Sequence, residues 1–174
     1  MLIRRASPHE VDAVVALVES AYRGDASRAG WTTEADLLDG QRTDADEVSR
    51  VLDHLLVAVA GDELIGCCVL EPREGHGHFG LFAVRPSSQG GGTGSRLLEA
   101  AEDSARQQGL DRVEMTVLSV REELLAYYER RGYRSTGQTK PFPYGEARFG
   151  LPRRDDLVFT VLAKDLSEAD AKVT

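Results

Sequence analysis

The feature that most constrains this chain is a cluster of glycines between a strand pattern and a helix pattern. Residues 79–84 are apolar and β-forming, and four glycines fall within the five residues 90–94. An amphipathic helix is expected from about Gly92 to Gln108, with Leu97 and Leu98 on its apolar face. A glycine-rich turn from strand to helix exposes backbone N–H groups at the positive end of a helix dipole. The segment therefore predicts an anion site, and the usual anion is a cofactor phosphate.

Two common nucleotide motifs do not fit this glycine cluster. The phosphate-binding loop of nucleotide hydrolases ends in Gly-Lys-Ser/Thr, whereas Gly94 is followed by Ser95 and Arg96. A dinucleotide fingerprint needs GxGxxG early in the chain, but counting from Gly90 or Gly92 places Ser95 or Leu97 at the third glycine. A flexible linker is disfavoured because regular patterns adjoin the cluster on both sides.

Strand and helix patterns alternate along the rest of the chain without a repeat or a linker. Strands are expected at residues 2–6, 55–60, 63–70, 79–84, 113–118, 133–139 and 157–163. Helices are expected at about 8–22, 32–38, 44–53, 92–108 and 121–131, and 24–30 reads as a loop. The order predicts an α/β protein, a mixed sheet with helices on its faces, formed by one domain over residues 1–174. The polar tail, residues 166–174, is expected to fray.

Composition argues against several classes of protein. Apolar residues make up 41% and charged residues 29%, which is typical of globular chains rather than disordered ones. The N-terminus lacks the apolar run of a signal peptide, and no stretch approaches the ~20 apolar residues of a membrane span. We therefore expect a cytoplasmic protein that binds no membrane. The net charge of −8 disfavours nucleic-acid binding and weakly favours a cationic or amine substrate.

Two local clusters could suggest other chemistry. Cys67 and Cys68 are adjacent in a buried strand pattern, so they are expected on opposite faces as reduced core thiols. His76 and His78 fall on one strand face near Glu74, but no third ligand follows at a recognised spacing, and no metal site is predicted.

Two motifs together resemble the GNAT acetyltransferase superfamily. Gln89-Gly90-Gly91-Gly92-Thr93-Gly94 is similar to its Gln/Arg-x-x-Gly-x-Gly/Ala signature. Tyr128-Glu129-Arg130-Arg131-Gly132-Tyr133 is similar to its Tyr-x-x-x-Gly-Phe/Tyr motif. The separation of the motifs and the order of elements agree over nearly the whole chain. The resemblance implies a GNAT-like fold, a central, mostly antiparallel, twisted sheet of about seven strands flanked by helices.

The resemblance implies acetyl-CoA as the donor and a primary amine, of a small molecule or a peptide N-terminus, as the acceptor. The glycine loop would wrap the CoA pyrophosphate with backbone N–H groups. The strand edge before the loop would bind the pantetheine arm, and one of its N–H groups would polarise the thioester carbonyl. The residues expected to bind the cofactor are Phe82, Ala83, Val84, Gln89, Gly90, Gly91, Gly92, Thr93, Gly94 and Ser95.

The resemblance also assigns an acid to the reaction. Tyr128 matches the family tyrosine that serves as general acid or hydrogen-bonds the sulfur, and Tyr127 is expected to be structural. Counting back along the strand before the loop reaches His78 as the candidate base, since an unperturbed imidazole titrates near ~6.5. Glu71, Glu114 and a chain of water molecules are the other candidates for the base.

One position departs from the family pattern. An Asn that contacts CoA often precedes the tyrosine helix, and here Ser119 or Arg121 takes its place. The acceptor pocket is expected from the region after the first helix and from the loop between the last two strands. Its candidate residues are Tyr22, Trp31, Glu34, Phe142, Tyr144, Arg148 and Phe149. Trp31, the only tryptophan, is either a pocket wall or a core anchor.

Three points stay open at this level. A non-catalytic CoA-binding sensor or interaction module would carry the same cofactor loop. Transfer of a longer acyl group depends on a channel that the sequence does not show. Dimers are common in the family, so a homodimer is one expected assembly.

Overall fold

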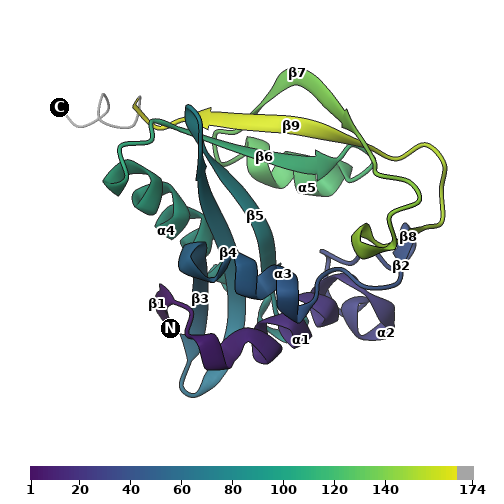
Figure 1. The fold of residues 1–174 in the computed structure, drawn as a ribbon, viewed down its shortest axis with the longest axis horizontal. Helices are drawn as coiled ribbons and strands as arrows, with labels where there is room; N and C mark the ends of the chain where they lie inside the picture. Colours follow the sequence, from purple (N-terminus) through teal and green to yellow (C-terminus); the bar gives the residue numbers. More distant parts are fainter. Residues whose placement is uncertain (168–174) are drawn as a thin grey trace.

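Seven strands form one twisted sheet in the order β1-β3-β4-β5-β6-β9-β7 (Figure 1). The strands are β1 (Leu2–Arg5), β3 (Leu55–Ala60), β4 (Glu63–Arg73), β5 (His76–Val84), β6 (Arg112–Leu118), β7 (Arg134–Pro141) and β9 (Val158–Asp165). Neighbouring strands are antiparallel except for the parallel pair β5–β6. This computed structural model describes residues 1–167 and confirms the expected mixed, mostly antiparallel sheet.

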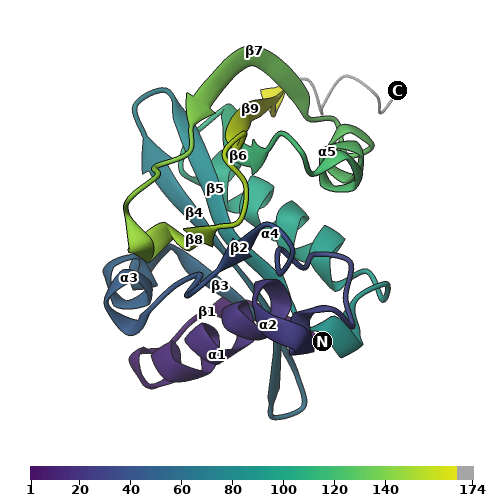
Figure 2. The ribbon, with the colours of Figure 1, turned by 90° about the vertical axis from the view of Figure 1, so that its right-hand side faces the viewer.

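Helices cover both faces of the sheet (Figures 1 and 2). They are α1 (Val11–Tyr22), α2 (Gly24–Ser27), α3 (Ala45–Arg50), α4 (Thr93–Gln107) and α5 (Glu122–Glu129), with short 3-10 turns at Pro8–Glu10, Leu52–His54, Pro86–Ser88 and Ala147–Phe149. One core lies between the sheet and α1 and α3, and another lies between the sheet and α4 and α5. Period-two alternation explains the division, because Cys67 belongs to the first core and Cys68 to the second.

The sheet opens where β5 leaves β6. The parallel register comprises only the pairs Gly77 with Val113 and His78 with Glu114, and Figure 1 shows the two strands diverging after it. β5 also carries a bulge opposite β4, where the register shifts between Cys67 and Val69. At this bulge Leu81 has φ +44°, a left-handed conformation that is costly for a leucine. The divergence leaves one edge of β5 free beside the bulge.

Three expected elements differ from the structure. The helix expected over residues 32–38 is wrong: this segment turns and ends in β2 (Leu38–Asp39), which pairs with β8 (Leu151–Pro152) (Figure 2). The expected loop 24–30 contains the short helix α2. β5 begins at His76, ahead of the expected Phe79, because Gly75 makes the turn at φ +79° and Gly77 then pairs with Pro72.

The expected tail is only partly within the described residues. Leu166 is buried against the α4 side of the sheet, and its N–H donates to the Asp111 carbonyl oxygen at 2.6 Å. The tail therefore does not fray at its first residue. Residues 168–174 lie outside the described part of the chain.

Candidate active site

The glycine loop has the backbone that glycine alone adopts cheaply. Gly90 and Gly92 have φ of +85° and +82°. Gly94 is required for a different reason, since a Cβ there would lie 3.0 Å from both Phe82 Cζ and Tyr127 Oη. Gly91 meets neither condition, because its Cβ would be 3.7 Å from the nearest atom, the Ser88 carbonyl oxygen. Two of the four glycines thus supply the left-handed backbone of the loop, and Gly94 allows the close approach of α4 to β5 and α5.

A cavity of about 440 Å³, here called the cofactor cavity, opens beside this loop. Of the residues expected to bind the cofactor, those that line it are Phe82, Val84, Gln89, Gly90, Gly92, Gly94 and Ser95. The side chains of Ala83 and Thr93 do not line it. Ala83 points to the core under α1, and Thr93 is 5% exposed at the start of α4. Any role of these two residues toward a cofactor belongs to their backbone.

Gln89 fastens the glycine loop to the segment after α2. Its Oε1 accepts from the Trp31 N–H at 2.9 Å, and its Nε2 donates to Thr32 Oγ1 at 2.9 Å and to the Val84 carbonyl oxygen at 3.0 Å. These bonds place Trp31 in the cofactor cavity, with its ring 5.2 Å from that of Tyr127. Trp31 thus lines the cofactor cavity, where Gln89 holds it, and not the cavity that holds the other expected acceptor residues.

Two arginines at the cofactor cavity were not predicted as site residues. Arg130 and Arg131 line it from the end of α5. The Arg131 guanidinium lies 3.5 Å above the Tyr127 ring, and its Nη2 donates to Ser95 Oγ at 2.6 Å. Their signal was present in the sequence, since both lie inside the Tyr-x-x-x-Gly motif, one helical turn after the tyrosines. Two cations beside a loop of backbone N–H groups suit a pyrophosphate.

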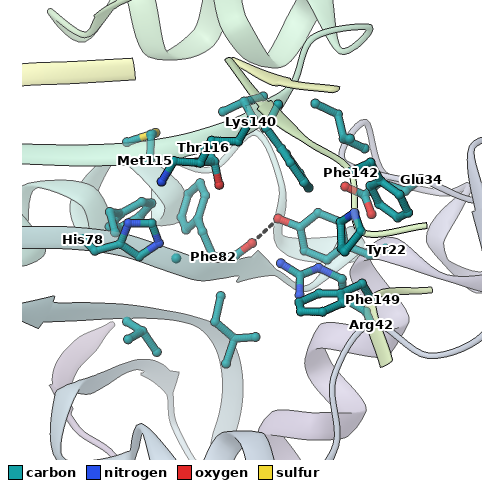
Figure 3. Close-up of a pocket in the computed structure, with 18 of the residues that line it drawn as sticks. Tyr22, Glu34, Arg42, His78, Phe82, Met115, Thr116, Lys140, Phe142 and Phe149 are labelled. Atoms are coloured by element: carbon teal, nitrogen blue, oxygen red, sulfur yellow. Dashed lines mark hydrogen bonds between the residues drawn. The ribbon is translucent and has the colours of Figure 1, made fainter. Parts of the chain in front are cut away.

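A second cavity of about 470 Å³, here called the acceptor cavity, lies on the other side of Phe82 (Figure 3). Phe82 is the one residue on both lining sets, so it forms the shared wall. The Tyr22 hydroxyl donates to the Phe82 carbonyl oxygen at this wall. Burial raises the pKa of Tyr22 to about 12, so its phenol stays protonated and keeps donating.

The structure brings most of the expected acceptor residues to this cavity. Those that line it are Tyr22, Glu34, Phe142, Arg148 and Phe149. Tyr144 does not line this cavity. Its ring is 44% exposed, and its hydroxyl donates to the Arg154 carbonyl oxygen at 3.1 Å and accepts from the Leu157 N–H at 2.8 Å. Tyr144 closes the loop before β9 and packs its ring 5.1 Å from Phe142.

Tyr128 is almost fully buried and lines the acceptor cavity. The centre of its ring lies 6.3 Å from that of Phe82 and 5.9 Å from that of Tyr133, with an interplanar angle of 69° to Tyr133. Within residues 1–167 its hydroxyl makes no hydrogen bond, while burial raises its pKa well above the ordinary value. Tyr128 is therefore a neutral phenol with a free donor, and its neighbour Tyr127 lines the cofactor cavity instead.

The candidate bases differ in position and charge. His78 lines the acceptor cavity, but burial, with a smaller effect of Arg73, lowers its pKa to about 4. It is then neutral at pH 7 and a weak proton acceptor. Glu71 lines the same cavity and lies 3.3 Å from Arg50. Glu114 lines neither cavity, because its carboxylate accepts from Arg112 at 2.9 Å.

Residues 13–133 match the family model described as "Acetyltransferase (GNAT) family". The chain belongs to the GNAT acetyltransferase family. It is similar to an "IAA acetyltransferase" of Azospirillum brasilense, with 33% identity over 149 residues, 82% of this chain and 89% of the relative.

Solved structures share the fold at low identity. The ribosomal-protein-alanine N-acetyltransferase of Brucella melitensis has a TM-score of 0.70 at 18% identity, covering 95% of this chain and 100% of that one. Rv2747 of Mycobacterium tuberculosis, solved in complex with CoA, has a TM-score of 0.66 at 19% identity, covering 95% and 99%. These neighbours agree with the GNAT arrangement of sheet and helices.

This GNAT chain replaces the family's Asn with residues that make other contacts. Ser119 shares a hydrogen bond of 2.7 Å with Thr160. Arg121 lies 3.3 Å from Glu34 and donates to the Thr32 carbonyl oxygen at 3.0 Å. Neither residue lines the cofactor cavity.

Two further findings bear on this family member. Cys67 and Cys68 are fully buried, and burial raises the pKa of the Cys67 thiol to about 12 and that of Cys68 well above its ordinary value. Such thiols are not activated nucleophiles.

Within residues 1–167, no helix has both the length and the apolar character that crossing a bilayer requires.

Proposed function

We propose that this protein transfers the acetyl group of acetyl-CoA to an amine nitrogen by direct attack of the amine on the thioester. One observation carries the proposal: the cofactor cavity and the acceptor cavity meet at a shared wall, Phe82. Transfer between two bound molecules requires the reacting atoms to approach within about 3–3.5 Å, which two adjoining cavities allow.

The cofactor cavity fits CoA by its shape and charge. A Cβ on Gly94 would fill the gap between the loop, Phe82 and Tyr127, so the chain keeps that space open. Backbone N–H groups of residues 90–95, with Arg130 and Arg131, would hold the pyrophosphate. The free edge of β5 after His78 would pair with the pantetheine amides. When bound there, acetyl-CoA supplies the reactive thioester.

The acceptor side supplies the proton donor. As the neutral amine nitrogen forms its bond to the acetyl carbon, the C–S bond breaks and the sulfur takes a proton from the Tyr128 hydroxyl, while the proton that the nitrogen loses on becoming an amide passes through water to restore the Tyr128 phenol. Tyr22 fixes the Phe82 carbonyl oxygen and with it the backbone at the bulge. With its pKa near 4, His78 does not hold the proton that an ammonium acceptor must lose, so that proton passes through water or Glu71 to solvent.

The buried cysteines support direct attack. An acetyl-enzyme intermediate needs an accessible nucleophile of lowered pKa. Cys67 and Cys68 are both 0% exposed with raised pKa values, which is the opposite condition.

The decisive variant is Tyr128→Phe, assayed by CoA release from acetyl-CoA over a panel of amines. Loss of the proton donor should lower kcat about 100-fold and leave the Kd for CoA within about twofold. Tyr133→Phe is the control. It removes a tyrosine hydroxyl from a residue that lines neither cavity, and it should keep the wild-type kcat. Full activity in Tyr128→Phe would remove Tyr128 from the mechanism. CoA binding without turnover of any amine would favour the non-catalytic module.

The same proposal covers the whole chain. One sheet takes β1 from one end of the chain and β9 from the other, which supports a single domain over residues 1–174. We place this domain in the cytoplasm, as a monomer or homodimer, without a nucleic-acid or membrane partner. Sedimentation analysis with and without CoA would determine its assembly.

A further inference from the structure

The acceptor cavity has a charge opposite to that of the whole chain. Seven Arg or Lys residues line it against three Glu, in a protein of net charge −8. Two of these carboxylates each lie within salt-bridge distance of two arginines. Glu34 lies 2.6 Å from Arg23 and 3.3 Å from Arg121, and Glu71 lies within 3.6 Å of both Arg50 and Arg73. Each of these groups keeps a net positive charge.

Two lining cations have no carboxylate partner within residues 1–167. The Lys140 ammonium is exposed at the β7 side of the cavity, above His78 in Figure 3. The Arg42 guanidinium is half-buried, with its central carbon 5.5 Å from the centre of the Tyr22 ring. Figure 3 shows it beneath Tyr22, beside the hydrogen bond from that ring to Phe82.

The same cations act on the titratable groups of the cavity. Burial raises the pKa of Tyr22, while Arg42 and Arg121 act to lower it and Glu34 acts to raise it; burial lowers the pKa of His78, and Arg73 and Lys140 lower it further against the opposite effect of Glu71. Cations therefore act on both ends of the cavity. A cationic acceptor would meet like charge there, against the expectation from net charge, whereas an anion would gain attraction.

We propose that the acceptor carries a carboxylate or a similarly compact anion a few bonds from its amine, and that Arg42 binds this anion. The proposal rests on the proposed function, because it names the class of acceptor for that reaction. Arg42 lies one tyrosine ring away from the shared wall, so the anion and the reacting nitrogen belong to the same small molecule. A free amino acid has this arrangement, and a peptide N-terminus, with an amide in place of the carboxylate, does not.

The test compares amino acids with their primary amides as acceptors, by kcat/KM. Wild type should favour the carboxylate member of each pair at least tenfold, after correction for the fraction of neutral amine. Arg42→Gln should abolish this preference, and Arg42→Lys should restore part of it. Arg28→Gln removes an arginine outside both cavities and should keep the preference. Because each comparison is a ratio between two acceptors, a general loss of stability cancels.

Two results would overturn the proposal. One is a wild-type preference for amides, diamines or peptide N-termini. The other is an Arg42→Gln variant that loses activity equally toward both members of each pair. If no amine is turned over, the proposed function fails, and binding of an N-acetyl amino acid in the presence of CoA, measured by calorimetry, still decides the inference. Binding to wild type but tenfold weaker to Arg42→Gln supports the anion site, and equal or absent binding contradicts it.

Discussion

Tyr127 and Tyr128 are neighbours in the chain but serve different cavities. Successive residues on a helix point about 100° apart, so α5 turns one ring toward the glycine loop and the other toward the acceptor. The Tyr127 ring lies 5.2 Å from the Trp31 ring and 3.5 Å from the Arg131 guanidinium, at the cofactor cavity. Neither tyrosine hydroxyl has a hydrogen-bond partner within the described residues, but of the two residues Tyr128 is the one that lines the acceptor cavity.

The lowered pKa of His78 predicts how stability responds to pH. The folded value is about 4 and the ordinary value is 6.5, so between these values the unfolded chain binds a proton that the folded chain does not. Stability then falls as pH falls through this window. Wild type should lose about 2 kcal/mol more unfolding free energy between pH 7 and pH 4 than His78→Gln does. Chemical denaturation at both pH values measures this difference.

His78 also predicts a kinetic result. Between pH 6 and pH 9 the residue stays neutral, so kcat/KM should show no inflection that His78→Gln removes. A wild-type inflection near pH 6.5 that disappears in the variant would restore His78 as the general base.

At the scale of elements, the loop and helix α4 act as a unit with β5 and α5. Gly94→Ala would place a methyl group 3.0 Å from Phe82 and Tyr127, and overpacking of this kind costs about 1–3 kcal/mol. We expect the Kd for CoA to rise about tenfold or more, measured by calorimetry. Gly91→Ala is the matched control three residues earlier, in the loop before α4, where the methyl group has space, and it should bind CoA as wild type does. Equal effects of the two substitutions would contradict the close approach at Gly94.

The regular elements were predictable and the loops were not, for a physical reason. Period-two and helical patterns are local, so the sheet strands and α4 could be expected from the residues alone. The pair β2–β8 has two residues on each side and exists through contacts between positions over a hundred residues apart. Trp31 and Tyr144 lie outside the lining of the acceptor cavity for the same reason, since Gln89 and the Leu157 N–H decide where they lie. Most residues expected to bind the cofactor line one cavity, because loop and strand are adjacent in sequence.

The net charge of the chain also fails to predict the charge of one cavity. The net value of −8 is a property of the whole surface, and it says nothing of which charges converge in one place. The cations of the acceptor cavity lie just after α1, before and at the end of α3, at the end of β4, just before α5, in β7 and in the 3-10 turn Ala147–Phe149, and only the fold brings them together.

At the scale of the whole molecule, a buried ionic group joins α4 to the far strands. Glu102 is 6% exposed and accepts hydrogen bonds from the Tyr133 hydroxyl at 3.0 Å and from Lys164 Nζ at 2.8 Å. Lys164→Met would leave this carboxylate with only the more distant Arg106, at 3.9 Å, at a cost of about 3 kcal/mol of unfolding free energy. Adding Glu102→Leu should recover most of the loss. If Lys164→Met alone is as stable as wild type in denaturant titrations, the ion pair between Glu102 and Lys164 contributes little to stability.

The account depends on two molecules being bound at once, on either side of Phe82. The most direct test is the initial rate of CoA release, measured while the concentrations of acetyl-CoA and an amine acceptor are varied together. Direct transfer in a ternary complex predicts double-reciprocal lines that intersect, and intact-protein mass spectra without an added acetyl group. Parallel lines together with an acetylated chain would contradict it. They would show a covalent acetyl-enzyme intermediate that forms before the amine binds.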